Sequence, residues 1–248
     1  KWLPAEISYG DQSKEGTEAM GKHLPKKTTA ALKHYLNALT KPQIKHFLVY
    51  LTGLIQLIKF HSTREIASQI AQALPDNLQR FLNGSMKKQE RLVEAHQDLL
   101  AQKANKAAQV LAVIDDTVCP REGKKIEGLG THHTSDGLLD GQCAVTCVLK
   151  VAREWLAWAV GGYRPKSSCR KDEFKSKVQW AQEILQGLRR KVHAPVTVLM
   201  DSWYTCAPIL LPIIEAGWTF VAAIKCNRIL EINGEKTVVR HLAKGPRT

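Results

Sequence analysis

The first half of the chain has a helical pattern of apolar residues. From Thr29 to about Lys106, apolar side chains recur at steps of three and four residues, which predicts a series of amphipathic helices. Ser62, followed by Thr63-Arg-Glu65, is typical of a helix N-terminus. A break at Pro75 precedes a short apolar helix that begins near Leu78 and ends at Asn83-Gly84.

Two helices separated by a break fit either of two arrangements. One is a helix-turn-helix, and the other is the packing of an ordinary helical bundle. The sequence leaves both open, because the crossing angle of the helices decides between them. In the first case four cations would contact DNA phosphates: Arg64, Arg80, Lys87 and Lys88.

After Ala107 the period changes to that of strands and helices in alternation. The expected strands are 109–115, 144–151, 155–160, 196–200 and 219–224, and the expected helices are 171–191 and 206–216. The polar, glycine-rich stretch 120–141 is expected to be a loop. The order β-β-β-α-β-α-β predicts an α/β fold whose mixed sheet has an antiparallel part and a parallel part, preceded by an all-α domain.

Composition and charge narrow the class of protein. With 248 residues, 44% hydrophobic and 24% charged, the chain is neither disordered nor a collagen or disulfide scaffold. Its formal net charge of +13 favours a polyanionic partner, either nucleic acid or an anionic membrane surface.

The segment from His46 to Phe60 is the most apolar of the chain, but it is shorter than the roughly 20 residues that a membrane span requires. We therefore expect a buried helix there and no membrane association. The six cysteines have no CxxC spacing, and we interpret them as reduced thiols of a cytoplasmic protein.

Two expected strands end in acidic residues, the first at Asp115-Asp116 and the fourth at Asp201. In open α/β sheets, functional groups gather beyond the carboxyl ends of the strands. Carboxylates on neighbouring parallel strands can share a divalent cation such as Mg²⁺ or Mn²⁺. A single aspartate at a strand end is otherwise a cap or turn residue, and the presence of two favours the metal site.

Five short motifs resemble those of DDE transposases encoded by bacterial insertion sequences. They are Val113-Ile-Asp-Asp-Thr117, Leu199-Met-Asp-Ser-Trp-Tyr204, Thr63-Arg-Glu-Ile-Ala67, Leu78-Gln-Arg-Phe-Leu82 and Gly161-Gly-Tyr-Arg-Pro-Lys166, and the resemblance runs from about Ala30 to the C-terminus. It implies an RNase H-like catalytic domain that cleaves DNA and transfers strands with Mg²⁺ or Mn²⁺, with two ions expected. The implied partners are transposon ends and target DNA, bound by a homodimer in a synaptic complex near the nucleoid.

The resemblance implies roles for individual residues. The family's Asp-x-Thr pattern falls on Asp115, which becomes the first catalytic carboxylate and metal ligand, with Asp116 as the alternate; Asp201 is the second. The family's third carboxylate is a helical Glu, and no such segment occurs between Lys225 and Thr248. Glu231 and Glu235 flank an Ile232-Asn-Gly234 hairpin turn and do not match it. We therefore expect a fragment that stops before the third carboxylate.

Other residues near the expected site are candidates for DNA contacts. The cations Lys124, Lys125, Lys225 and Arg228 would hold phosphates, or else belong to a solvated surface. Trp203 and Tyr204 would stack on an unpaired base, or else pack the following helix. His132 and His133 would line the site, or else be exposed turn residues.

The expected domains are a polar arm (1–28), a helical DNA-binding domain (29–107), the RNase H-like domain (108–228) and the start of a truncated β-rich insertion (229–248). Two other functions remain open. One is a catalytically inactive, truncated or domesticated transposase that only binds DNA. The other is a structure-selective nuclease of the same fold, which would cut without joining.

Overall fold

A computed structural model describes residues 32–57, 62–71, 75–84, 86–123, 126–134, 137–170 and 172–242, excepting the side chains of Ala71, Met86 and Lys87. The chain divides into two compact units, residues 1–99 and 100–248, which are treated separately here. The expected arm, 1–28, lies outside the described residues. No helix in the described part of the chain is both long enough and apolar enough to cross a membrane.

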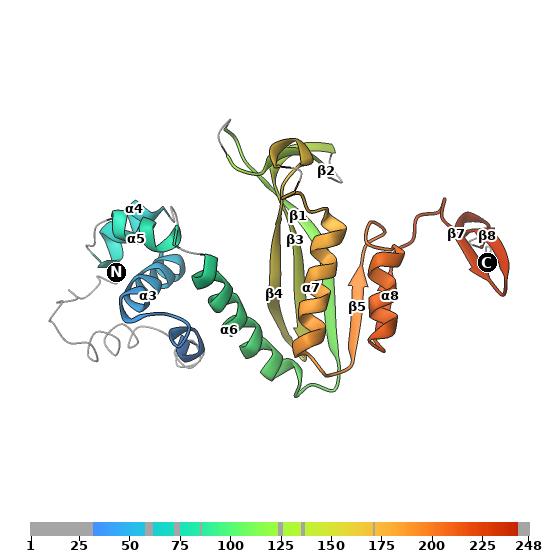
Figure 1. Cartoon of the computed structure of the whole chain (residues 1–248), viewed down its shortest axis with the longest axis horizontal. Coiled ribbons are helices and arrows are strands. Elements are labelled where there is room, and N and C mark those ends of the chain that lie inside the picture. Colours follow the sequence, from blue (N-terminus) through green and yellow to red (C-terminus); the bar gives the residue numbers. More distant parts are fainter. Residues whose placement is uncertain are drawn as a thin grey trace. The chain divides into compact units, whose positions relative to one another are not determined.

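The first unit is helical, as its apolar spacing predicts (Figure 1). Its elements are α3 (Lys41–Gln56), α4 (Thr63–Ile66), the π-helical turn η1 (Ala67–Ala71), α5 (Pro75–Leu82) and α6 (Met86–Ala104), whose last residues belong to the second unit. The expected helix start is confirmed, because the Ser62 side chain accepts a hydrogen bond from the amide of Glu65 and caps α4. The following helix begins at Pro75, earlier than expected, since proline suits the first turn of a helix.

The second unit is built on a mixed sheet. Its strands are β1 (Val110–Pro120), β2 (Leu129–Thr134), β3 (Gly137–Val151), β4 (Glu154–Tyr163), β5 (Val196–Met200) and β6 (Thr219–Ala222). Strand β3 pairs antiparallel with β1, β2 and β4, whereas β5 pairs parallel with β1 and β6. The order β4-β3-β1-β5-β6 confirms the expected RNase H-like mixed sheet.

Helices α7 (Lys177–Lys191) and α8 (Ala207–Glu215) cover one face of this sheet (Figure 1). Alternate residues of β1 and β3 are buried against them, and α7 contributes Ala181, Leu185 and Leu188 to the same core. The other face of the sheet carries exposed apolar side chains, including Val160 at 68% and Val221 at 64% exposure.

Helix α7 begins later than the expected Lys171, because Ser176 and Gln179 form a capping box. The expectation of a loop over 120–141 is wrong in part. This stretch contains an antiparallel hairpin, formed by β2 and the first part of β3. His132 therefore lies on a strand and is buried, whereas His133 is exposed.

Residues beyond β6 form a two-stranded hairpin, β7 (Ile229–Ile232) and β8 (Glu235–Val238), and the short helix α9 (Val239–Leu242). Asn233 and Gly234 both have positive φ, 52° and 85°, as a two-residue type I′ turn requires, and this confirms the expected hairpin turn. The third carboxylate of the family is a glutamate on a helix, whereas Glu231 and Glu235 lie on the strands of this hairpin.

Candidate active site at Asp115 and Asp201

The two expected carboxylates lie at the same edge of the sheet. In the parallel pairing of β1 with β5, the last paired residues are Ile114 and Met200. Asp115 directly follows Ile114, and Asp201 directly follows Met200. Their charges interact, since repulsion by Asp201 contributes to the pKa of Asp115. The structure therefore brings these two residues together. The expected end of the first strand at Asp115 is wrong, however, because β1 continues to Pro120 through its pairing with β3.

Asp115 is held in a setting that disfavours its ionised form. Burial raises the pKa of its carboxyl above the ordinary value of 3.8, and the charges of Asp116 and Asp201 add to the rise. A hydrogen bond from the amide of Asp116 to Oδ1 of Asp115, 2.8 Å long, acts in the opposite direction. A bound cation would favour the ionised carboxylate, which this site otherwise penalises.

Asp201 also organises the turn that follows β5. Its Oδ1 accepts hydrogen bonds from the amides of Trp203, at 2.9 Å, and Tyr204, at 3.4 Å. An aspartate that binds amides two and three residues ahead stabilises a turn. Both bonds go to Oδ1, so the turn role and a metal-binding role concern different oxygens of one carboxylate.

Asp116 points to the opposite face of β1 and has different partners. Its Oδ2 is 2.6 Å from the ammonium of Lys177, and its Oδ1 accepts a hydrogen bond of 3.1 Å from the hydroxyl of Tyr204. The thiol of Cys143 is 3.6 Å from Oδ2. Consecutive residues of a strand face opposite sides, and the pairing with Lys177 makes Asp116 part of an ion pair rather than a companion of Asp115 and Asp201.

Two predicted DNA contacts do not fit their surroundings. Tyr204 is fully buried, at 0% exposure, so its ring cannot stack on a base. Lys88 is only 4% exposed. Its ammonium donates a hydrogen bond to the backbone carbonyl of Phe81 and lies 4.2 Å from the centre of the Phe81 ring. Both predictions are wrong for the same physical reason, because side chains that look polar or cationic in sequence are enclosed by packing.

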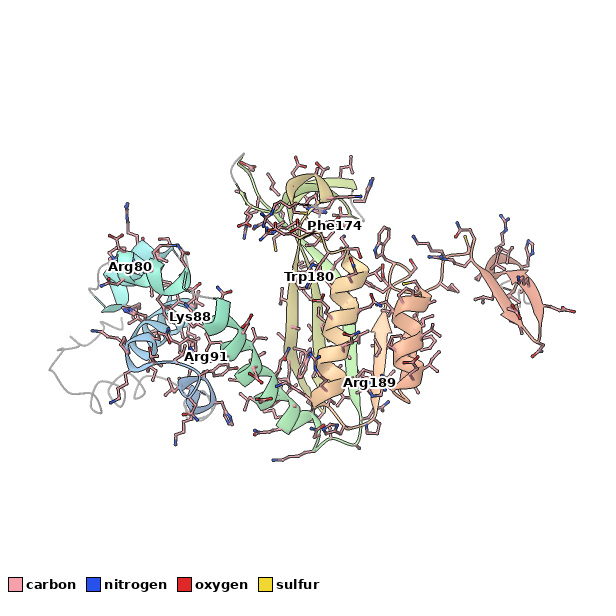
Figure 2. The ribbon with its side chains drawn as sticks, in the orientation of Figure 1. Arg80, Lys88, Arg91, Phe174, Trp180 and Arg189 are labelled. Atoms are coloured by element: carbon pink, nitrogen blue, oxygen red, sulfur yellow. The ribbon has the colours of Figure 1, made fainter. Side chains whose placement is uncertain are left out.

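The remaining predicted contacts are on the surface or outside the described part. Arg64 and Arg80 are exposed in the first unit, and Figure 2 shows Arg80 on α5. Lys225 and Arg228 are exposed after β6. Lys124 and Lys125, and the side chain of Lys87, lie outside the described residues.

Trp203 and Lys225 form an exposed aromatic and cationic pair beside Asp201. Trp203 is 54% exposed, and the ammonium of Lys225 lies 5.0 Å from the centre of its ring. Trp203 follows β5 and Lys225 follows β6, so the pair lies at the same edge of the sheet as the carboxylates. This combination can receive a base and a phosphate.

A cavity of about 670 Å³ borders the far end of β1. Its lining includes Cys119, Arg121, Tyr163, Arg164, Lys175 and Trp180. Arg164 pairs with Glu127 at 2.7 Å, and Lys175 pairs with Glu183 at 2.8 Å. The sequence did not single out Arg121, Lys175 or Lys177, because their proximity to the site depends on pairings between distant segments.

The donor set fits a hard divalent cation in part. Carboxylate oxygens suit Mg²⁺ and Mn²⁺, and Mg²⁺ is commonly bound through one or two carboxylates, with water and substrate phosphate completing its shell. Across the described ranges, no three His, Cys, Asp or Glu side chains are close enough together to hold a metal ion. Glu231 and Glu235 are both exposed on the β7–β8 hairpin.

All six cysteines are free thiols. Burial raises the pKa of Cys147 to about 12, so this thiol stays protonated and inert.

Comparison with solved structures finds transposases at low similarity. A piggyBac transposase in a synaptic complex with hairpin DNA is 12% identical, with a TM-score of 0.42, over 85% of this chain and 45% of that chain. The Mos1 strand transfer complex is 15% identical, with a TM-score of 0.28, over 71% of this chain and 58% of that chain. The chain thus spans less than half of the piggyBac transposase, and similarities at this level carry no argument about activity.

Among curated proteins, a sequence search finds no match. A family model described as DDE superfamily endonuclease, in contrast, matches residues 34–247. This match covers most of the chain and includes both units, so the protein belongs to the DDE superfamily of endonucleases.

Proposed function

We propose that the protein is a DNA transposase whose RNase H-like domain cleaves and joins DNA strands at transposon ends. The observation that carries this proposal is that Asp115 and Asp201 directly follow the last paired residues, Ile114 and Met200, of the adjacent parallel strands β1 and β5. Membership of an endonuclease family supports phosphodiester chemistry at this pair.

Asp115 and Asp201 would hold the divalent cation, Mg²⁺ or Mn²⁺, with two ions expected. When bound, such ions supply an activated hydroxyl and stabilise the leaving oxygen of an in-line phosphoryl displacement. The family pattern calls for a third carboxylate, which would come from outside the described residues.

The exposed cations and Trp203 would position the DNA strand. Lys225 and Arg228 would bind phosphates on either side of the reacting one, and Trp203 would stack on a base next to it. In the first unit, Arg64 and Arg80 would contact phosphates of the transposon end. A homodimer that binds two ends would form the synaptic complex.

Replacement of either carboxylate tests this function. In a protein that carries the third carboxylate, Asp115→Asn and Asp201→Asn should each abolish Mg²⁺-dependent cleavage of DNA with the transposon ends, because each removes a proposed metal ligand. DNA binding should change by less than about threefold, because the cations that contact phosphates are kept. Cleavage is followed on gels and binding by fluorescence anisotropy. Asp172→Asn, an exposed aspartate in the turn before α7, is the matched control and should keep full activity.

The same assay distinguishes the alternatives. An inactive DNA-binding descendant is the second candidate, because the described residues hold two suitable carboxylates and not three. It would bind the ends and cleave nothing at any Mg²⁺ or Mn²⁺ concentration. A structure-selective nuclease would cleave but yield no joined product when a target plasmid is present.

A further inference from the structure

Four elements meet at the carboxylate of Asp116. The ion pair comes from Lys177, the first residue of α7, and the hydroxyl from Tyr204, in the turn after β5. Cys143 contributes its thiol from β3. The side chains of Lys177 and Asp116 are only 18% and 20% exposed, so this charge pair is largely withdrawn from water.

Within this cluster Tyr204 contacts both β1 and the turn after β5. Its hydroxyl donates to Asp116, the neighbour of Asp115 in β1, and its backbone amide donates to Oδ1 of Asp201 at 3.4 Å. Its ring is fully buried in the core of the second unit. One buried residue therefore connects the turn after β5 to the middle of β1.

The direction of the hydroxyl bond is well defined. Burial, followed by the nearby charge of Asp116, raises the pKa of Tyr204 far above its usual range. In this bond the hydroxyl of Tyr204 is the donor and the Oδ1 of Asp116 is the acceptor, at 3.1 Å.

The ion pair has a second effect on the site. Three aspartates lie in β1 and directly after β5, and three unbalanced carboxylates in one place would repel each other. Lys177 balances the charge of Asp116. In the described part of the chain, Asp115 and Asp201 form no ion pair with a cationic side chain. Asp116 thus serves as an anchor for Tyr204.

We propose that Tyr204 is a positioning residue, which holds the main chain at Asp115 and Asp201 in register so that both carboxylates face one cation. This inference rests on the proposed function, since it assigns a role to a residue behind the proposed metal site. Outer residues that orient metal ligands typically change metal affinity by about 10- to 100-fold when they are replaced.

Metal affinity of the 248-residue chain, measured with Mn²⁺ by electron paramagnetic resonance, tests the role. Tyr204→Phe should raise the dissociation constant for Mn²⁺ by about tenfold. The matched control is Tyr35→Phe, which also removes one tyrosine hydroxyl bond, from Tyr35 to His96 in the first unit, and should leave the constant unchanged. Thermal unfolding of both variants checks that they are folded.

A double variant keeps the test independent of folding losses at position 204. Asp116→Asn combined with Lys177→Met removes both charges of the pair and retains an amide oxygen for the Tyr204 hydroxyl. Its Mn²⁺ affinity should match that of the wild type. A loss as large as that of Asp115→Asn would make Asp116 a ligand and overturn the assignment.

Two further outcomes separate the positioning role from the function. If Tyr204→Phe binds Mn²⁺ as tightly as the wild type, while Asp115→Asn abolishes binding, the positioning role is wrong and the metal site stands. If wild-type binding is insensitive to Asp115→Asn, the proposed metal site is wrong, and the role of Tyr204 falls with it.

Discussion

Consecutive aspartates in β1 have opposite environments. Asp116 points towards α7 and has an ammonium at 2.6 Å, whereas the pKa of Asp115 is raised by burial and by neighbouring carboxylates. The difference follows from strand geometry, since successive side chains alternate between the two faces of a sheet. The charge of Asp116 is consequently balanced within the protein by Lys177, whereas a bound cation would stabilise the charge of Asp115.

The raised pKa of Asp115 predicts a pH-dependent stability. The folded state holds this proton more tightly than the unfolded state, so the contribution of Asp115 to stability is present at low pH and is lost as the pH rises through its raised pKa. Without metal, Asp115→Asn should therefore have a higher melting temperature than the wild type at pH 7. The difference should shrink as the pH approaches about 4, where unfolded aspartate also becomes protonated.

Differential scanning fluorimetry in EDTA measures this effect. Asp172→Asn, at an exposed position, should show little change at either pH. An Asp115→Asn variant that melts below the wild type at pH 7 would contradict the proposed penalty on the charged form.

At this scale the sequence predicted Asp115 and Asp201 from their places at strand ends. It could not predict the partners of Asp116, because Lys177 is 61 residues away and Tyr204 is 88 residues away along the chain. The wrong predictions for Tyr204 and Lys88 have the same origin. Burial is a property of tertiary packing, and amphipathic side chains fit either a surface or an interior.

At the scale of elements, the contact between β4 and α7 depends on a glycine. Gly161 lies beneath the ring of Trp180, which Figure 2 shows on α7. A methyl group at position 161 would come within 2.6 Å of Cε3 of Trp180, closer than packed atoms allow. The close approach brings α7 onto the sheet and places Lys177 beside Asp116.

Adjacent glycines provide a matched test of this contact. Gly161→Ala should reduce the free energy of unfolding by about 1–3 kcal/mol, because Trp180 or the strand has to shift. Gly162→Ala, where an added methyl meets nothing within 4 Å, should change it by less than about 0.5 kcal/mol. Urea unfolding followed by tryptophan fluorescence measures both, and equal effects of the two changes would contradict the role of the contact.

Sequence patterns located most elements and missed those without a pattern of their own. The strand 196–200 and the hairpin turn at Asn233-Gly234 were predicted with their observed bounds. Strand β2 has no apolar alternation and contains Gly130, so it is stabilised by its pairing with β3 rather than by local preference. The start of α7 was readable from the Ser176-x-x-Gln179 capping box, which the apolar period alone did not reveal.

At the scale of the whole molecule, the net charge of +13 would govern the proposed association with DNA. Each phosphate contact releases about one counterion, so the binding constant should fall steeply as salt rises. This charge acts on any DNA sequence, and the helical unit would add the choice of transposon ends. The charge alone could not distinguish DNA from another polyanion, whereas the pair of carboxylates and the family match favour DNA.

Single cations can be tested through the salt dependence. Lys225→Gln and Arg228→Gln should each reduce the slope of log K against log salt by about 0.9. Arg189→Gln is the control, because Arg189 is exposed in the last turn of α7 (Figure 2), whereas Lys177, which pairs with Asp116, is the first residue of that helix. Fluorescence anisotropy with double-stranded DNA gives the slopes, and an equal loss for Arg189→Gln would point to diffuse attraction instead of local contacts.

The mixed pairing of β1 has a consequence for how the site forms. Strand β1 pairs antiparallel with β3, which follows soon after it, and parallel with β5, which follows only after β4 and α7. Pairings between distant segments require a larger loss of chain entropy, so we expect the β1–β5 contact to form after the antiparallel part. A growing chain that has folded only its antiparallel strands holds Asp115 without Asp201, so cutting competence would be acquired only when synthesis has passed β5.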